Sequence, residues 1–569
     1  MTALIHQAAK YRAIFLHILF CAIGVVILFY PVIQSSFALM PSNPGDSRLV
    51  NYFLEHYFQL FFNRQYIGSF WSAPFFFPYS NTLTFSENLF GASPVYWVFR
   101  FLFDESTSFQ LWMIAVSCLN FFSFSHLLKQ FEVNLAFRII GSFVFAFSLP
   151  RISALGFPQL LPQFFTPLSF LYICKFIQKP TIKYLTLFLS FIYLQILSGI
   201  YLGWFLCFSI FIFVLSIYSV RLNPKLQLIK FVKSSYKISI PIFSMWLLLI
   251  FIFLQPYLKT KSVFGSRPYS EVDTMLPRLS SWFSIIPGSA LGSALQWKNP
   301  DLPMIWEHYL FSGFTLILFS IISIIILTKY KKYLVKSNQI IAISSFITGL
   351  VIIALSLRLP NGFSLWKTIY DIFPGASVIR AVSRIWTVVY FYILITNCIC
   401  LTAIFQKKIL RNIRLFLVFS LTIIVVLEQV SFTQNTYAKA SFDKESESIE
   451  YLLKKSQNCD FAYVQLSSNQ AFWADQVSAM WGGIKANVPV INGYSGNVPP
   501  NYGSSTVSMN LETSIHWLQS NNPTIQGNLC MVSRTTEEQS DPLVKQYSID
   551  HYVHPEGGFE VDIIPVPIE

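Results

Sequence analysis

Charged residues are scarce in this sequence. Asp, Glu, Lys and Arg make up 12% of its 569 residues, whereas apolar residues make up 54%. Soluble globular domains carry roughly twice that charged fraction. The mean hydropathy of +0.53 agrees with the low charge. These values exclude an ordinary soluble protein and predict an all-α polytopic membrane bundle.

Several catalytic motifs are absent as well. The sequence contains no zinc-type ligand cluster, phosphate-binding loop, dinucleotide fingerprint or nucleophile elbow. It shows no internal repeat, although many transporters are built from repeated halves. The absence of a nucleotide motif fits chemistry at an outer membrane face, where no nucleotide is needed.

Cysteine is rare, and its positions form two groups. Six cysteines lie within or at the ends of apolar runs, where we expect them to act as small hydrophobic residues: Cys21, Cys118, Cys174, Cys207, Cys398 and Cys400. The last two are two positions apart in a predicted helix, so their side chains diverge and do not form a metal or redox pair. Cys459 and Cys530 belong to the polar C-terminal stretch. If that stretch is periplasmic we expect a disulfide, and otherwise two free thiols.

Long apolar runs are what the sequence has in abundance. Several reach the ~20 residues that a helix needs to cross a bilayer. The first run, at about 13–36, carries no charge, is too long for a signal-peptide core and is followed by no convincing cleavage site, so it is treated as a retained anchor. We predict about eleven membrane spans, at 13–36, 109–127, 135–150, 158–177, 184–199, 201–219, 238–256, 311–328, 339–357, 387–405 and 415–431.

The basic residues indicate the orientation of these spans. A net charge of +13 would suggest nucleic acid in a soluble protein, but here about half of the Lys and Arg residues fall in alternate, short connections. The other connections, at 37–108, 257–310 and 358–386, are long and mixed in charge. The positive-inside rule therefore places the N-terminus in the cytoplasm and the long loops and the C-terminal tail outside. No nucleic-acid partner is expected.

The stretch 184–219 allows two interpretations. It is almost continuously apolar, with Ser198-Gly199-Ile200 near its centre, and fits a tight helical hairpin or one kinked helix. We predict the hairpin because the basic residues on both flanks require the same side of the membrane. A single helix would reverse the orientation of everything that follows.

Two segments outside the spans carry structure of their own. The first outer loop, 37–108, contains an aromatic stretch at 52–62 that is expected to be an interfacial helix, a proline-interrupted stretch at 70–79 and a second amphipathic segment that ends near Arg100. The tail is richer in polar residues and long enough for a small soluble α/β domain. We therefore divide the chain into a transmembrane module at 1–431 and a periplasmic domain at 432–569.

Asp46 is the principal candidate for a chemical role. It follows Pro44 and Gly45, a few residues after the first apolar run. An Asp at this place is a preferred helix N-cap. Alternatively, a carboxylate at the outer bilayer surface can act as a general base towards a hydroxyl or bind a divalent cation. The spacing alone favours neither role.

An acid just after the first span, a loop with interfacial helices, many spans and a soluble outer tail together resemble the GT-C superfamily. These are integral membrane glycosyltransferases that use polyprenyl-phosphate-linked sugars. The resemblance covers the whole chain and is specific at one point, Gly45-Asp46. It implies that Asp46 is the catalytic base. The stretches 374–384 and 490–496 also look like segments of large bacterial membrane proteins of this general type.

Other residues of the first outer loop are weaker candidates. The resemblance implies a second acidic residue in an outer loop, and Glu87 is the preferred one, with Asn88 able to assist by hydrogen bonding. Glu55 lies on nearly the opposite face from Asp46 if the helix is straight. His56 is a candidate for substrate binding. The alternative for Glu55 and His56 is an exposed interfacial face.

Two arginines of the third outer loop are candidates for phosphate binding. Arg380 and Arg384 are four residues apart and share one face if the segment is helical. They can extend to lipid headgroups, or they can clamp the phosphate of a lipid-linked donor. Arg278 and Arg151 are weaker candidates for the same role. Glu428 is the one acid inside a predicted span, where it either faces the bundle interior or is solvated near the surface.

The preferred hypothesis is inverting transfer of a sugar from polyprenyl phosphate to a glycan, lipid or protein acceptor at the periplasmic face of a bacterial inner membrane. Asp46 would deprotonate the acceptor, Glu87 would orient groups or a metal, and the arginines would hold the phosphate. No nucleotide is required at this face, and a divalent metal is the one candidate cofactor. The alternative is a non-enzymatic transporter or flippase of a lipid-linked glycan. Large outer loops and short cytoplasmic ones favour the enzyme.

Overall fold

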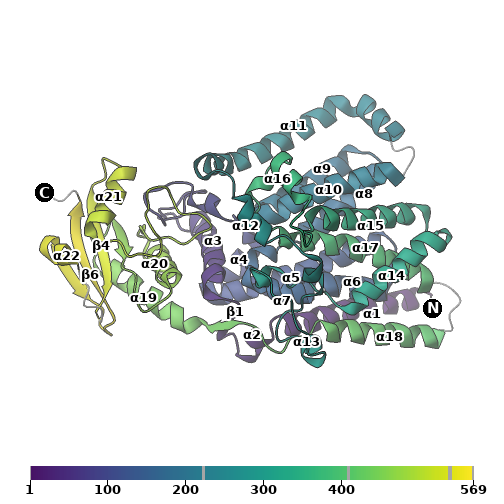
Figure 1. The fold of residues 1–569 in the computed structure, drawn as a ribbon, viewed down its shortest axis with the longest axis horizontal. Helices are drawn as coiled ribbons and strands as arrows, with labels where there is room; N and C mark the ends of the chain where they lie inside the picture. The colour runs from purple at the N-terminus through teal and green to yellow at the C-terminus, as the bar shows by residue number, and fades with distance from the viewer. Residues whose placement is uncertain (1, 221–224, 406–410, 536–540, 567–569) are drawn as a thin grey trace. The chain divides into compact units, whose positions relative to one another are not determined.

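The computed structural model describes residues 2–220, 225–405, 411–535 and 541–566. It divides into two compact units (Figure 1). Unit 1 contains Met1–Gln34, Trp112–Phe253 and Ser266–Gln434, and unit 2 contains Ser35–Leu111, Leu254–Gly265 and Asn435–Glu569. The chain is mostly helical, with a small sheet near the C-terminus.

Unit 1 consists of helices. Its long helices, two of which continue into unit 2, are α1 (Thr2–Leu28), α5 (Glu105–Gln130), α6 (Leu135–Phe147), α8 (Phe165–Gln178), α9 (Ile182–Ser198), α10 (Ile200–Val220), α11 (Lys225–Phe264), α14 (Phe314–Lys329), α15 (Lys336–Ser356), α17 (Trp386–Phe405) and α18 (Arg411–Glu428). Each predicted span overlaps one of them. In the described part of the chain, eight helical segments are long and apolar enough to cross a membrane, and α9 and α14 are shorter apolar helices. The number of eleven spans stays a prediction.

The stretch 184–219 forms two helices, as predicted. Helix α9 ends at Ser198 and α10 begins at Ile200, with Gly199 between them. The two helices pack closely next to this break, because a Cβ atom on Gly203 of α10 would lie 2.6 Å from the Cα atom of Ile196 on α9. A larger residue at this position would force the two helices apart.

The connections of unit 1 gather at two ends of its helices (Figure 1). At one end, Lys175 Nζ donates to Gln130 Oε1 at 3.2 Å, and Asn338 Nδ2 donates to the main-chain oxygen of Phe131 at 2.8 Å. At the other end, the second and third outer loops meet, since the main-chain nitrogen of Arg267 donates to the oxygen of Ser377 at 3.1 Å. The basic connections thus share an end, although which membrane face that end occupies stays a prediction.

Unit 1 also contains five short helices in its described residues. They are α2 (Tyr30–Gln34), α7 (Leu149–Ser153), α12 (Tyr269–Thr274), α13 (Ala290–Ala294) and α16 (Trp366–Ile372). Two of them, α12 and α13, come from the second outer loop, and α16 comes from the third. The outer loops are therefore partly helical.

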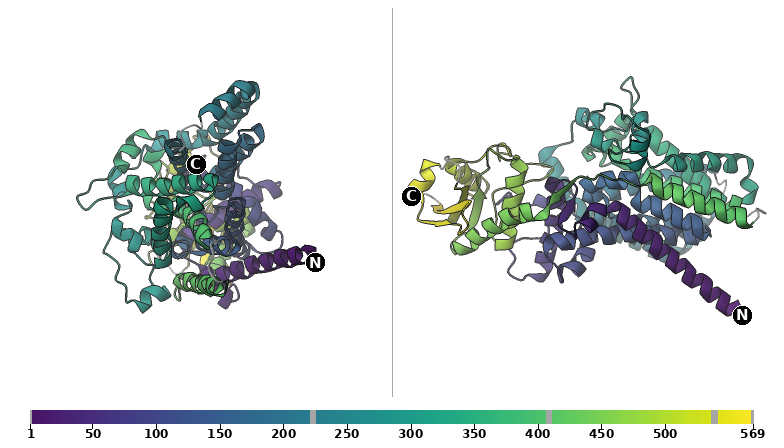
Figure 2. Two further views of the ribbon diagram at one scale, coloured as in Figure 1. Left: turned by 90° about the vertical axis from the view of Figure 1, so that its right-hand side faces the viewer. Right: turned by 90° about the horizontal axis from the view of Figure 1, so that it is seen from below.

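Unit 2 contains a four-stranded sheet (Figure 2). Its strands are β3 (Phe461–Val464), β4 (Gly527–Arg534), β5 (Asp550–Val553) and β6 (Phe559–Val566), in the order β3-β4-β6-β5. Strands β3 and β4 are parallel, and the other pairs are antiparallel. The accompanying helices are α19 (Lys439–Lys455), α20 (Phe472–Ala486), α21 (Leu511–Asn521) and α22 (Pro542–Tyr547). A separate antiparallel pair joins β1 (Leu39–Pro41) to β2 (Thr436–Ala438).

The first outer loop belongs to the same compact unit as the tail. Helices α3 (Pro44–Phe62) and α4 (Ser93–Arg100) come from this loop, and Tyr52 and Phe75 share a buried core with Trp481 of α20. The boundary predicted at residue 432 instead groups this loop with the membrane helices and apart from the tail. Hydrophobic periodicity reports that a face is buried but not which segment covers it.

Large apolar side chains remain exposed at the C-terminal end of α3 and just after α4. Phe61 and Phe62 are 51% and 48% exposed, and Phe101 and Leu102 are 60% and 74% exposed. The N-terminal two-thirds of α3 is instead mostly buried within the unit. An interfacial position therefore stays a prediction for this end of α3 and for α4 only.

Candidate functional site

Helix α3 is capped by Asn43 and not by Asp46. The Asn43 side-chain oxygen accepts hydrogen bonds from the main-chain nitrogens of Gly45, at 3.0 Å, and Asp46, at 3.3 Å. Pro44 occupies the first turn, where its missing N–H costs nothing. Asp46 thus lies in the first turn of the helix, where the helix dipole stabilises a negative charge. The capping alternative for Asp46 does not hold.

The Asp46 carboxylate is held by a tyrosine from the tail. The Tyr494 hydroxyl donates to Asp46 Oδ1 at 3.0 Å. Gly45 permits this contact, because a Cβ atom there would lie 3.3 Å from the same hydroxyl and 3.7 Å from the Trp473 ring. Asp46 is partly exposed, although Gly45 and Ser47 on either side are buried. The arrangement yields an oriented carboxylate that solvent can reach.

Sequence reasoning did not single out Tyr494 as a site residue. Tyr494 is 448 positions from Asp46. The only sequence signal for Tyr494 is its place in the stretch 490–496, which resembles segments of other membrane proteins. No rule of local spacing links two residues so far apart, so the pairing emerges only in the folded unit.

Glu87 and Asn88 are also residues of unit 2. Glu87 is 5% exposed and Asn88 is fully buried. Asn88 Nδ2 donates to the Tyr257 hydroxyl at 3.4 Å, and that hydroxyl donates to the main-chain oxygen of Ser86 at 3.3 Å. This burial makes both residues more suitable for positioning their neighbours than for contact with a substrate.

Glu55 and His56 do not form an exposed face. Glu55 is 2% exposed and accepts hydrogen bonds from Arg100 Nε at 2.8 Å and from the Tyr96 hydroxyl at 2.7 Å. His56 is fully buried, and its Nδ1 pairs with the Tyr66 hydroxyl at 2.7 Å. Burial lowers the pKa of His56 to about 3, so the ring is neutral at physiological pH. His56 is therefore inaccessible to a ligand in this structure.

Arg380 and Arg384, in unit 1, differ in their surroundings. Arg384 is buried and makes two contacts with Glu307, at 2.6 Å and 3.2 Å, with its guanidinium 4.2 Å from the centre of the Phe157 ring. The Arg380 side chain is 40% exposed and pairs with Glu271 at 3.3 Å. They do not share one face of an α-helix, because Arg384 lies in the 3₁₀ helix Val382–Ile385 and Arg380 precedes it. Arg380 is thus the accessible member of the pair.

Arg278 is largely engaged by its own loop. Its Nη1 donates to the main-chain oxygens of Thr274, at 3.1 Å, and Leu276, at 3.2 Å. It also lies 3.2 Å from His308 Nε2. These bonds organise the second outer loop and weaken the case for Arg278 as a phosphate ligand.

Two further charged side chains stabilise the helices of unit 1. Arg151 is 1% exposed and donates to the main-chain oxygens of Phe145 and Leu160 at 3.1 Å and 2.9 Å. Glu428 accepts the main-chain N–H of Thr315 through both carboxylate oxygens, at 3.1 Å and 3.2 Å. It therefore satisfies the N-terminus of α14 from the neighbouring α18.

A dedicated metal cage is not evident. Among the described residues, no group of three or more His, Cys, Asp or Glu side chains could hold a metal ion. Magnesium can also be bound by only one or two carboxylates together with substrate phosphates.

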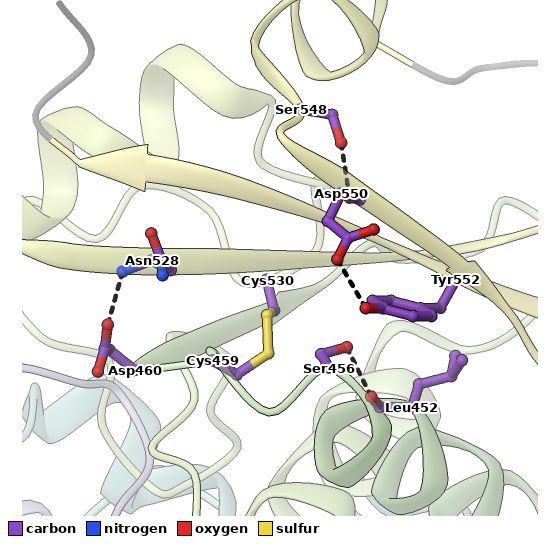
Figure 3. Close-up of a disulfide and its surroundings, with 9 residues drawn as sticks. All are labelled: Leu452, Ser456, Cys459, Asp460, Asn528, Cys530, Ser548, Asp550 and Tyr552. Carbon is purple, nitrogen blue, oxygen red and sulfur yellow. Dashed lines mark hydrogen bonds between the residues drawn. A yellow bond between two sulfur atoms is a disulfide. The ribbon is translucent and has the colours of Figure 1, made fainter.

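Cys459 and Cys530 form a disulfide (Figure 3). Their Cα atoms are 5.7 Å apart, although 71 positions separate them in sequence. The bond links the segment just before β3 to its parallel neighbour β4. Beside it, the main-chain nitrogen of Asn528 donates to Asp460 Oδ2 at 2.8 Å. The disulfide and the β3–β4 ladder thus join the same two segments.

The long apolar helices define this chain as a membrane protein. A scan against models of known protein families and a search of curated proteins give no match. Among solved structures, the chain is similar to the crystal structure of an oligosaccharyltransferase from Archaeoglobus fulgidus in the apo form. The identity is 13%, the TM-score is 0.49, and the match covers 97% of this chain and 74% of the other. A likeness at this level assigns no family, residue or substrate to this chain.

Proposed function

We propose that this protein transfers a sugar from a polyprenyl-phosphate-linked donor to an acceptor hydroxyl at the periplasmic face of a bacterial inner membrane, with Asp46 as general base. The main support for this proposal is that the Asp46 carboxylate is oriented by a hydrogen bond and yet partly exposed. Asn43 fills the capping position, and Tyr494 orients the Asp46 carboxylate while it remains partly exposed. Acidic side chains held in this way are suited to take a proton from a bound hydroxyl.

In the proposed reaction the acceptor oxygen attacks the anomeric carbon of the sugar. Its proton moves to the Asp46 carboxylate as the new carbon–oxygen bond forms. The bond between the sugar and the phosphate breaks, and polyprenyl phosphate leaves with that pair of electrons. The attack from the opposite side inverts the configuration at the anomeric carbon. The N-terminus of α3 favours the ionised carboxylate that this step requires.

Two further assignments belong to the same proposal. In unit 1, Arg380 is the arginine that binds the donor phosphate, because it is exposed and Arg384 is committed to Glu307. In unit 2, Glu87 and Asn88 act as positioning residues, since both are buried. Guanidinium groups bind phosphate with two parallel hydrogen bonds, so Arg380 suits this role.

Mass spectrometry of envelope glycans tests the proposed function. Cells would carry the wild type, Asp46→Asn or a full deletion, with protein levels measured in parallel. Replacement by Asn retains the shape of the side chain and removes its charge. We expect one sugar to be missing from a glycan in the deletion strain and in Asp46→Asn at normal protein level.

Asp301→Asn supplies the matched control, because Asp301 is an exposed aspartate of another outer loop. It should leave the glycan unchanged. If the deletion alters a glycan but Asp46→Asn behaves as the wild type, Asp46 is not the base. Transport of a lipid-linked glycan then becomes the better explanation.

A further inference from the structure

Unit 2 contains a small charged pocket that the proposed reaction does not use. We call it the Arg48 pocket, and its charged and amide side chains are Arg48, Asn51, Glu105, Lys439, Asp443 and Lys485. It has room for about one water-sized group. Arg48 and Asp46 are two positions apart on α3, which places them roughly 200° apart around the helix. The pocket is thus separate from the Asp46 carboxylate.

Arg48 is a buried cation with neutral hydrogen-bond partners. It is 6% exposed and donates to the hydroxyls of Ser446, at 3.0 Å, and Ser478, at 3.3 Å. Its guanidinium also lies 4.8 Å from the centre of the Phe442 ring. Among the described residues, no carboxylate lies within ion-pair distance of it. Burial lowers the pKa of Arg48 to about 10, so the group keeps its charge at neutral pH without a direct counter-ion.

Two lysines increase the positive charge of the pocket. Lys439 Nζ donates to the Thr107 hydroxyl at 2.9 Å and, in the described part of the chain, forms no ion pair. Lys485 Nζ lies 3.7 Å from Glu105, but that carboxylate also pairs with Arg100 at 3.4 Å. The pocket therefore contains three cations and two carboxylates, and one of these carboxylates, Glu105, also pairs with Arg100.

The second carboxylate of the pocket, Asp443, offers less negative charge than a solvated aspartate. Asp443 accepts a hydrogen bond from the Ser106 hydroxyl at 3.3 Å. Burial raises the pKa of Asp443, which favours its neutral form relative to a solvated aspartate. The pocket therefore carries a net positive charge, and Arg48 is its most deeply buried charged group.

Asn51 provides a second, independent indication that the pocket binds a ligand. It is 4% exposed, and its Oδ1 has no hydrogen-bond partner among the described residues. Its Nδ2 makes one long bond, 3.4 Å, to the main-chain oxygen of Glu105. A buried amide oxygen without a donor is costly. A hydroxyl on or beside a bound anion would satisfy it.

The segments that build the pocket adjoin helices of the predicted membrane spans. Glu105 and Ser106 begin α5, and Met40 lies in β1, which follows α1 and α2. Tyr437 lies in β2, which follows α18. The pocket is therefore built from segments that are adjacent in the sequence to three predicted spans.

We propose that the Arg48 pocket binds a phosphate group that carries a hydroxyl, either as free hydrogen phosphate or in a lipid headgroup such as phosphatidylglycerol. The hydroxyl is the group that enters the pocket, where its oxygen accepts a hydrogen bond from Arg48 and its proton is donated to Asn51 Oδ1. Lys439 and Lys485 balance the charge of the phosphate. Because the pocket joins α3, α5, α19 and α20, the bound phosphate stabilises unit 2 independently of the proposed reaction.

Ligand-dependent unfolding of the full chain tests this proposal. Protein in a phosphate-free maltoside detergent is heated with rising concentrations of inorganic phosphate or, separately, of short-chain phosphatidylglycerol, at constant ionic strength. We expect the Tm to rise and saturate with at least one of the two probes. Lys439→Gln and Lys485→Gln retain Arg48 and should each raise the apparent Kd about tenfold, because each removes a positive charge close to the phosphate.

Lys454→Gln is the matched control, because Lys454 lies on α19 with a side chain that is 57% exposed. It should respond as the wild type does. A response to phosphate alone assigns the free anion, and a response to the lipid alone assigns the headgroup. The proposal is overturned if neither probe raises the Tm, or if Lys439→Gln and Lys485→Gln respond as strongly as the wild type.

Discussion

Asn43 and Asp46 have separate roles at the start of α3. Asn43 satisfies the main-chain N–H groups that a helix terminus leaves unpaired, and Asp46 is oriented by Tyr494. Either residue type can cap a helix, so the sequence alone left the role of Asp46 open. The hydrogen bonds of the Asn43 side chain show that Asn43, and not Asp46, caps the helix.

Tyr494→Phe tests whether Tyr494 positions the proposed base. The substitution removes the hydroxyl that donates to Asp46 Oδ1 and retains the ring. A hydrogen bond to a charged group is worth about 1.5–3 kcal/mol, so we expect kcat to fall about tenfold or more. KM for the acceptor should change little, because the ring and the surrounding contacts remain. Sugar transfer measured in isolated membranes gives both constants.

Tyr451→Phe is the control for this substitution, since Tyr451 is a 41% exposed tyrosine of α19. Its kcat should equal that of the wild type. An unchanged kcat in Tyr494→Phe would show that the hydroxyl only packs against α3 and does not position the carboxylate.

At the scale of elements, unit 2 is held together by polar contacts between helices and strands. Arg534 of β4 pairs with Asp475 of α20 at 2.7 Å and with Glu445 of α19 at 3.2 Å. The Ser478 hydroxyl donates to Glu445 at 3.2 Å and accepts from Arg48 at 3.3 Å. A continuous network therefore connects α3 with the sheet through α19 and α20.

The disulfide between Cys459 and Cys530 is expected to stabilise the elements of the tail. Cross-linking residues 71 positions apart stabilises a fold by about 4 kcal/mol in the chain-entropy description. We expect the double substitution of both residues by Ala to lower the Tm and to make the tail sensitive to protease. A reductant should have the same effect on the wild type and none on the double variant.

Cys207→Ala serves as the control, because Cys207 is a free cysteine on α10. It should leave the protease pattern unchanged. Equal protease resistance of the double variant and the wild type would mean that the β3–β4 ladder alone secures these segments.

At the scale of the whole molecule, charge placement predicts orientation. The ends of α5 and α8 that carry basic residues meet at one end of unit 1, and the second and third outer loops meet at the other. The grouping of the loops agrees with the sequence analysis. Their assignment to the cytoplasm or the periplasm rests on the positive-inside rule.

Cysteine labelling tests this orientation. Asn361 and Lys332 are exposed residues of connections predicted to lie on opposite sides of the membrane. In spheroplasts, a membrane-impermeant maleimide should label Asn361→Cys, whereas Lys332→Cys should react only after the membrane is opened. The parent chain gives the background of the native cysteines. The reverse pattern would mean that the orientation is inverted and that the proposed site faces the cytoplasm.

The sequence by itself determined the membrane class, the positions of the long helices and the break between α9 and α10. These features follow from apolar run length and from local conformational preference, which act over short distances along the chain. It also placed Asp46 next to a helix N-terminus. Only the tertiary structure decided that the first outer loop shares a core with the tail, that Tyr494 binds Asp46, and that Glu307 occupies Arg384. Those contacts join residues tens to hundreds of positions apart, and no local pattern specifies which buried or charged partner a side chain will meet.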